Sequence, residues 1–253
     1  MPLPSHTFAV SLDDLPDWHQ GIRQYAVWCL PVDNPDWQAF IHQAQVALAS
    51  LLHTGYARQP HITLFAAGLV DKNHYTDIMR CAQIQSLELY SLSPVLLTAS
   101  SLSTFSTAPW LGITDGDNQL QRLRNVLGLT HGEDSPPPRY QPHVTLGFYN
   151  DIYPIETVQE RLEPLQQQAL ALPPLRIDRL QLCYYDTRQV QGRLDVKENI
   201  ELKAETTVDN SPLDPLEAVR QMRRDQLRVC ALKQKTELEQ LIGSADKESK
   251  QNR

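Results

Sequence analysis

The chain has 253 residues, of which 41% are apolar and 21% are charged, and its formal net charge is −7 at pH 7. This length accommodates one large domain or one domain with an appendage, and the composition excludes a fibrous or wholly disordered chain. The acidic balance disfavours a broad basic face for long nucleic acid and leaves room for a small local basic patch only.

The cysteines and the N-terminus bear on metal sites and on the compartment. The four cysteines are dispersed, form no Cys-x-x-Cys pair and have no histidine beside them at metal-site spacing. We therefore expect no metal site and no cofactor. The N-terminus lacks the basic and apolar regions of a signal peptide, and no stretch approaches about 18 apolar residues. We expect a cytoplasmic protein with reduced thiols and no membrane contact.

Short apolar runs and helical periodicities alternate from residue 25 to residue 203. Residues 1–24 precede them without sustained periodicity, and we interpret this segment as an extension that lies against the domain. Strand-forming runs predict strands over residues 25–32, 61–65, 87–92, 95–102, 110–114, 143–149, 177–185 and 195–202. Apolar positions at i, i+3 and i+4 spacing predict helices over residues 37–52, 74–85, 118–129 and 155–171. A proline-rich surface loop is predicted at residues 132–139.

The character of the chain changes after residue 203. Residues 204–212 are polar, and we interpret them as a linker. Asp214, Pro215 and Glu217 are typical of a helix start, which predicts a long helix over residues 213–243. A disordered tail is expected at residues 244–253. The helix is a candidate surface for a protein partner, although its basic residues are more typical of a solvated face.

One six-residue sequence occurs twice. Gln-Pro-His-Ile-Thr-Leu begins at Gln59, and Gln-Pro-His-Val-Thr-Leu begins at Gln141, which places the second histidine 82 residues after the first. Each copy follows a predicted helix. A repeat of this period indicates two similar lobes within one domain.

The repeated motif carries groups that suit phosphodiester chemistry. Successive side chains of a strand alternate between its faces, so His61 and Thr63 point to one face, as do His143 and Thr145. If a pseudo-twofold axis relates the lobes, two imidazoles and two hydroxyls converge on one groove. One imidazole then accepts a proton from the attacking oxygen, the other protonates the leaving oxygen, and the hydroxyls donate to phosphate oxygens.

The matched pair of motifs resembles the signature of the 2H phosphoesterases, in particular the branch of RNA 2′,3′-cyclic phosphodiesterases also called 2′-5′ RNA ligases. The resemblance covers about residues 25–202. It implies an α+β fold with two pseudo-symmetric lobes whose antiparallel sheets surround a central groove. It also implies His61 and His143 as acid and base, without fixing which is which, and Thr63 and Thr145 as phosphate ligands.

The activity that the resemblance implies is metal-independent opening of a 2′,3′-cyclic phosphate, on an RNA terminus or a small nucleotide, to leave a 2′-phosphate. Two alternatives stay open: a module that binds a nucleotide or RNA end without catalysis, and a 2′-5′ RNA ligase. Retention of both histidines and both threonines favours an enzyme, since a receptor has no need of a matched acid and base.

Residues near the motifs have weaker predictions. Phe65 and Tyr149 share strand parity with the histidines, so they are candidates for stacking a base in the groove, with core packing as an equal alternative. Arg58 and Arg139 precede the motifs and could steer a phosphate, but solvated surface arginines are the preferred interpretation.

Overall fold

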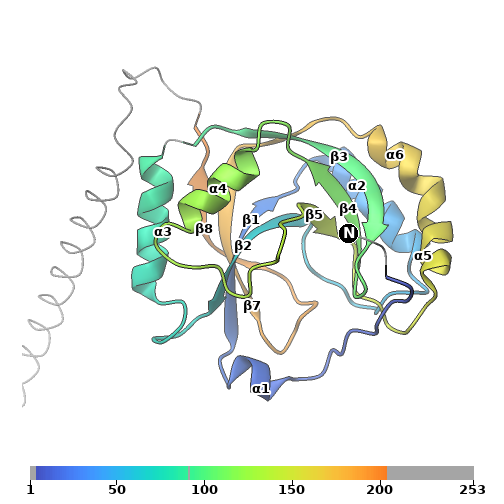
Figure 1. The fold of residues 1–253 in the computed structure, drawn as a ribbon, viewed down its shortest axis with the longest axis horizontal. Coiled ribbons are helices and arrows are strands. Elements are labelled where there is room, and N and C mark those ends of the chain that lie inside the picture. Colours follow the sequence, from blue (N-terminus) through green and yellow to red (C-terminus); the bar gives the residue numbers. More distant parts are fainter. Residues whose placement is uncertain (1–3, 91, 204–253) are drawn as a thin grey trace, which may run out of the picture. The chain divides into compact units, whose positions relative to one another are not determined.

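The computed structural model describes residues 4–90 and 92–203, and its centre is one antiparallel sheet (Figure 1). The strand order is β6-β3-β4-β5-β2-β1-β7-β8. The strands are β1 (Gln24–Pro31), β2 (His61–Leu69), β3 (Val95–Thr104), β4 (Pro109–Thr114), β5 (His143–Thr145), β6 (Leu175–Ile177), β7 (Arg179–Asp186) and β8 (Asp195–Glu201). The helical segments are α1 (Pro16–His19), α2 (Pro35–Ala47), α3 (Asp77–Leu89), α4 (Gln119–Leu127), α5 (Ile155–Leu162), the 3-10 turn η1 (Glu163–Leu165) and α6 (Gln166–Leu170).

The sheet consists of two halves that repeat each other. Lobe 1 contains β2, β1, β7 and β8, lobe 2 contains β5, β4, β3 and β6, and the lobes meet where β2 pairs with β5. The unit β1-α2-β2 of lobe 1 corresponds to β4-α4-β5 of lobe 2. The bilobal, antiparallel α+β fold predicted from the sequence is thus confirmed for the described residues. The predicted linker, C-terminal helix and tail lie outside them.

The helices cover the sheet in two groups, as Figure 1 shows, with α3 and α4 on one side and α2, α5 and α6 on the other. Helix α4 follows a strand of lobe 2 but contacts β2 of lobe 1, and α3 contacts α4 and β8. Helix α2 follows a strand of lobe 1 but contacts α5, while α5 and α6 contact β3 of lobe 2. One helix from each lobe therefore packs against the other lobe, and these contacts hold the two halves together as one domain.

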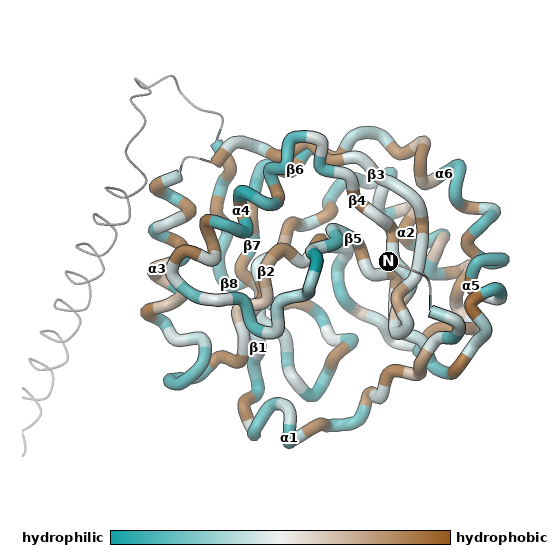
Figure 2. Tube along the Cα trace, in the orientation of Figure 1, coloured by the Kyte–Doolittle hydropathy of each residue, from teal (hydrophilic) through white to brown (hydrophobic). Residues whose placement is uncertain are grey.

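A buried glutamine of α3 connects the sheet to α4. The Trp28 indole nitrogen donates to Gln83 Oε1 at 2.7 Å, and Gln83 Nε2 donates to the Leu127 carbonyl at 2.9 Å. Gln83 is fully buried, so each of these hydrogen bonds satisfies a polar group that water cannot reach. Along the tube of Figure 2, apolar residues recur on these helices and strands, which fits a core between them.

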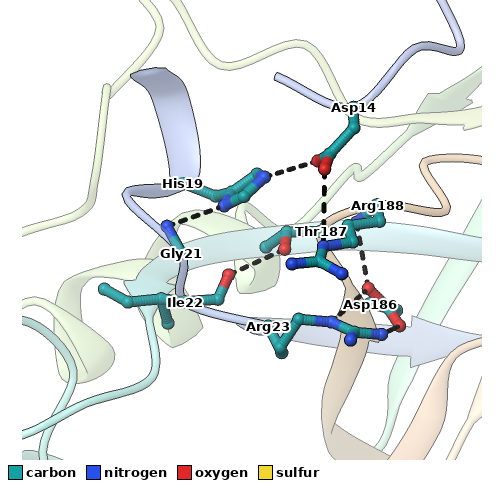
Figure 3. Close-up of polar contacts among 8 residues, drawn as sticks. All are labelled: Asp14, His19, Gly21, Ile22, Arg23, Asp186, Thr187 and Arg188. Carbon is teal, nitrogen blue, oxygen red and sulfur yellow. Dashed lines mark hydrogen bonds and ion pairs between the residues drawn. The ribbon is translucent and has the colours of Figure 1, made fainter. Parts of the chain in front are cut away.

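The N-terminal segment is fixed to the turn between β7 and β8 by polar contacts (Figure 3). The carboxylate of Asp14 lies 2.6 Å from His19 Nε2 and 3.5 Å from Arg188 Nε. Arg23 pairs with Asp186 at 2.5 Å. His19 is buried despite its polarity, and these contacts supply the partners that burial requires.

Two predicted elements differ from the structure, one in type and one in continuity, because a local sequence pattern does not show how the segment packs. The strand predicted over residues 87–92 is wrong, since α3 continues to Leu89 with Ser86 and Leu87 on its buried side. The helix predicted over residues 155–171 is interrupted by a 3-10 turn at Pro164. Proline lacks the amide hydrogen that a continuous helix would use there.

Two predicted strands differ in extent. The strand predicted over residues 177–185 is two strands, since β6 pairs with β3 and β7 pairs with β1. Only Asp178 separates β6 from β7 along the chain, yet β6 is at one edge of the sheet and β7 is next to the other edge. The sheet must therefore be strongly curled. The strand predicted over residues 143–149 ends at Thr145. Gly147 follows with φ 156°, and a Cβ there would lie 2.9 Å from a methyl carbon of Leu52.

The helices of the described residues are short. None of them in residues 4–90 or 92–203 is long and apolar enough to span a membrane.

Candidate functional site

The two motifs lie side by side at the junction of the lobes. Ile62 of β2 pairs with Val144 of β5, and both side chains are fully buried. In an antiparallel pair this register places His61 opposite Thr145, and places Thr63 opposite His143. Since neighbours along a strand alternate faces, these four side chains share the face opposite the buried pair. The structure therefore brings together the four residues that the repeat singled out.

Both imidazoles are held in the same way. His61 Nδ1 lies 2.7 Å from the Gln59 carbonyl oxygen, and His143 Nδ1 lies 2.7 Å from the Gln141 carbonyl oxygen. A carbonyl oxygen only accepts hydrogen bonds, so Nδ1 carries the proton and donates in each ring. This tautomer leaves Nε2 of each ring without a proton and available to accept one.

The prolines of the two motifs anchor them to the neighbouring chain. The Pro60 carbonyl accepts from the Val32 amide at 3.0 Å, and the Pro142 carbonyl accepts from the Ile113 amide at 3.1 Å. These bonds are equivalent under the pseudo-symmetry, since Val32 follows β1 and Ile113 lies in β4. The backbone before each histidine is thus held by the same contact in both lobes.

Burial makes both histidines weak bases. It lowers the pKa of His61 to about 4, and the positive charges of Arg58 and of a protonated His143 act in the same direction, against the Gln59 carbonyl. Burial also lowers the pKa of His143, and the Gln141 carbonyl opposes this effect. A neutral imidazole is favoured at both positions, more strongly at His61.

The two threonines complete the polar face. Both are half-buried, and among the hydrogen bonds of residues 4–90 and 92–203 neither hydroxyl has a partner. A hydroxyl donates one hydrogen bond and accepts two, so each threonine has its full capacity for a ligand.

Aromatic side chains surround His143. The ring of Phe105 lies 5.0 Å from it, edge on at 81°, and the ring of Trp110 lies 6.1 Å away. The Trp110 indole nitrogen is buried and has no partner in the described part of the chain. Neither aromatic was predicted, because Phe105 lies between strands and Trp110 reaches His143 only through the pairing of β4 with β5.

Arg58 lies over an aromatic ring of β7. Its guanidinium carbon is 4.3 Å from the centroid of the Tyr185 ring, and its charge contributes to the lowered pKa of His61. Arg58 is therefore half-buried against Tyr185 and is not a fully solvated arginine. Arg139 is exposed, as predicted for a solvated surface arginine. Because Arg58 lies in the loop before β2, strand parity gives no indication of its direction.

Phe65 does not reach the polar face. The pairing of β1 with β2 shifts register at this point, since Trp28 pairs with Phe65 and Cys29 pairs with Thr63. The extra residue, Leu64, turns Phe65 into the main core, where it is 3% exposed. Strand parity assumed a regular strand, and the bulge makes its placement of Phe65 in the groove wrong.

Tyr149 is also a core residue. It is fully buried, and its hydroxyl lies 2.6 Å from Thr104 Oγ1. The strand ends four residues earlier at Thr145, so the parity that aimed Tyr149 at the groove does not extend to it. Of the two equal alternatives for each aromatic, the structure bears out core packing.

A cavity of about 450 Å³ lies beside His61. Its walls include His42 and Gln45 of α2 together with Gln181 and Cys183 of β7. No group of three His, Cys, Asp or Glu side chains suited to a metal ion occurs in the part of the chain that the structure describes. The polar groups that the structure places near the motifs are the two imidazoles, the two threonine hydroxyls and the guanidinium of Arg58.

Solved structures of other proteins are similar to this chain. LigT from E. coli, in a crystal structure with ATP, is 16% identical over 73% of this chain and 100% of its own, with a TM-score of 0.45. A conserved protein of unknown function from Agrobacterium tumefaciens is 12% identical over 69% of this chain and 85% of its own, with a TM-score of 0.51. No curated protein matched the sequence.

The sequence profile of one family also matches. It is described as the 2′-5′ RNA ligase superfamily, and the match covers residues 32–189, which include both His-x-Thr motifs. Since this range is more than half of the chain, the protein belongs to the 2′-5′ RNA ligase superfamily.

Proposed function

We propose that the protein opens 2′,3′-cyclic phosphates, on RNA ends or on small nucleotides, to 2′-phosphates by acid–base catalysis that needs no metal ion. The observation that carries the proposal is the register of β2 and β5, which sets two identically held imidazoles and two unpartnered hydroxyls on one face. A phosphodiester needs one proton accepted and one donated on opposite sides of phosphorus, and two histidines supply both.

In the reaction, His61 serves as the base and His143 as the acid. His61 Nε2 takes a proton from a water molecule whose oxygen bonds to phosphorus, and the bond from phosphorus to the 3′ oxygen breaks. His143 Nε2, protonated at the start, gives its proton to that 3′ oxygen, so the 2′-phosphate remains. His61 suits the base because its pKa, about 4, keeps it neutral. The acid must bind a proton before each turnover, and an anionic substrate beside His143 favours this.

The threonines hold the phosphate. In the register of β2 and β5, Thr63 lies opposite His143 and Thr145 lies opposite His61. Their hydroxyls, which have no partner among the described residues, donate to the non-bridging oxygens. Negative charge on these oxygens rises as water attacks, so the hydrogen bonds strengthen in the transition state. Because these hydrogen bonds are stronger in the transition state than in the bound substrate, they increase the rate of the reaction.

Two observations favour hydrolysis over a binding module. Both imidazoles use Nδ1 for a backbone carbonyl, which leaves Nε2 of each ring to exchange a proton with the substrate, a capacity that a receptor for an anion would not require. Both are also kept at a lowered pKa, a common property of groups that transfer protons. A ligase differs only in the attacking group, which is an RNA hydroxyl in place of water.

The test is a substrate panel with product identification. The protein is incubated with the four nucleoside 2′,3′-cyclic phosphates, with an RNA ending in one, and with ADP-ribose 1″,2″-cyclic phosphate. We expect turnover of at least one nucleoside or RNA substrate to the 2′-phosphate, separated from the 3′-phosphate by chromatography. A 3′-phosphate as main product would mean a reversed substrate pose, and no turnover of any substrate would refute the proposal.

A further inference from the structure

We propose that Arg58, held on the ring of Tyr185, is the residue that binds the charge of the substrate's phosphate beside His61. This inference rests on the proposed function for its substrate. It assigns the site a cation that the two His-x-Thr motifs do not contain.

The first observation is that Arg58 lacks a counter-ion. Four arginines of the described residues are half-buried, namely Arg58, Arg80, Arg124 and Arg179. The last three contact the carboxylates of Glu198, Glu133 and Asp33, respectively. Arg58 contacts no carboxylate within residues 4–90 and 92–203, and its buried Nε has no hydrogen-bond partner there. A buried N–H group without an acceptor is unfavourable, so an acceptor that the described residues do not supply, such as an anion, is indicated at Nε.

The second observation is that Arg58 has a fixed position. Its guanidinium lies over the Tyr185 ring, and the Tyr185 hydroxyl interacts with it. Tyr185 packs against the smaller apolar cluster of lobe 1, which includes Cys29 and Cys183. The N–H groups of a guanidinium point outward in its own plane, so stacking on an aromatic ring leaves them accessible at its edge. There they form a fork that matches the oxygens of a phosphate.

The third observation is the neighbourhood of His61. Arg58 is close enough to act electrostatically on both His61 and Cys29, and Cys29 pairs with Thr63 in the register of β1 and β2. Arg58 also precedes His61 by only three residues in the chain, so its charge belongs to the half of the site that carries His61 and Thr63. A cation there both attracts the phosphate and disfavours protonation of the base before the substrate binds.

Within residues 4–90 and 92–203, lobe 2 has no equivalent cation without a counter-ion, since Arg124, which lies over the ring of Tyr140, pairs with Glu133. Arg139, which precedes the second motif, is exposed, and His143 has Phe105 and Trp110 as neighbours instead. The site is thus symmetric in its histidines and threonines but asymmetric in charge. One lobe supplies the cation, and the inference places the phosphate's negative oxygens toward that lobe.

The experiment compares Arg58→Gln with Arg139→Gln, which removes the same charge from the exposed arginine before the other motif. Inorganic phosphate is titrated by isothermal calorimetry, and kcat/KM is measured on the best cyclic phosphate. Loss of a charge-assisted hydrogen bond should weaken phosphate binding and kcat/KM roughly 10- to 100-fold in Arg58→Gln. Arg139→Gln should match wild type within about twofold, and Arg58→Lys should regain part of the loss since it keeps the charge but not the fork.

Histidine NMR provides a readout that a merely structural role would not move. Arg58→Gln should raise the pKa of His61 and leave that of His143 nearly unchanged, whereas Arg139→Gln should shift neither. Wild-type phosphate affinity and kcat/KM in a folded Arg58→Gln protein would overturn the inference. The proposed function fails separately, if wild type turns over no cyclic phosphate while phosphate binding still depends on Arg58.

Discussion

The pH dependence of kcat/KM follows from the burial of the two histidines. This quantity reports the ionisation of the free enzyme. The base is lost when His61 is protonated, so the rate falls as pH drops below about 4. The acid is lost when His143 gives up its proton, and burial lowers the pKa of that group from its ordinary value. The pH profile of kcat/KM should therefore be bell-shaped, with its maximum below about pH 6.5, which is the ordinary pKa of imidazole.

The size of the alkaline fall can be worked out. With a His143 pKa below about 6.5, less than roughly 3% of the acid form remains at pH 8, so kcat/KM should be about 30-fold or more below its maximum. The assay uses initial rates at substrate concentrations well below KM and constant ionic strength, with circular dichroism at each pH as a control for folding. A cyclic phosphodiester keeps one negative charge throughout, so both limbs belong to the protein. A maximum above pH 7, or a rate that rises with pH without turning over, would refute this reasoning.

Two further predictions concern the threonines and a corrected aromatic. Thr63→Ala and Thr145→Ala should each lower kcat about 10- to 100-fold, because one hydrogen bond to a charged group contributes roughly 1.5–3 kcal/mol; wild-type kcat in both variants would remove the threonines from the mechanism. Tyr149→Phe should lose the bond to Thr104 and about 1 kcal/mol of unfolding free energy in urea titration, with kcat/KM unchanged. A tenfold drop in kcat/KM there would return Tyr149 to the site.

The centre of the site was predictable because it depends on short-range geometry. Strand parity over two residues is enough to place His61 with Thr63 and His143 with Thr145, and the repeat itself indicates two lobes. The register of Ile62 with Val144 was not predictable in the same way. It depends on which strands pair, and sequence periodicity carries no information on that.

The predictions that were wrong concern features set by interactions over a longer range of the chain. Parity counted over four or six residues failed at Phe65 and Tyr149, because one bulge or one strand end reverses or cancels it. Arg58 was interpreted as a solvated surface residue because a loop has no periodicity from which to infer the direction of its side chain. The exchange of helices between the lobes was missed because it follows from tertiary packing alone.

The central claim is that His61 and His143 act together as base and acid. The direct measurement is kcat of His61→Ala, His143→Ala and the double variant on one nucleoside 2′,3′-cyclic phosphate, with melting temperatures as the control for folding. Acid and base catalysis each contribute roughly 10²- to 10⁴-fold, so each single variant should lose that much. Groups that act as a unit are not additive, so the double variant should be little slower than the slower single variant. Wild-type kcat in either folded single variant would contradict the two-histidine mechanism.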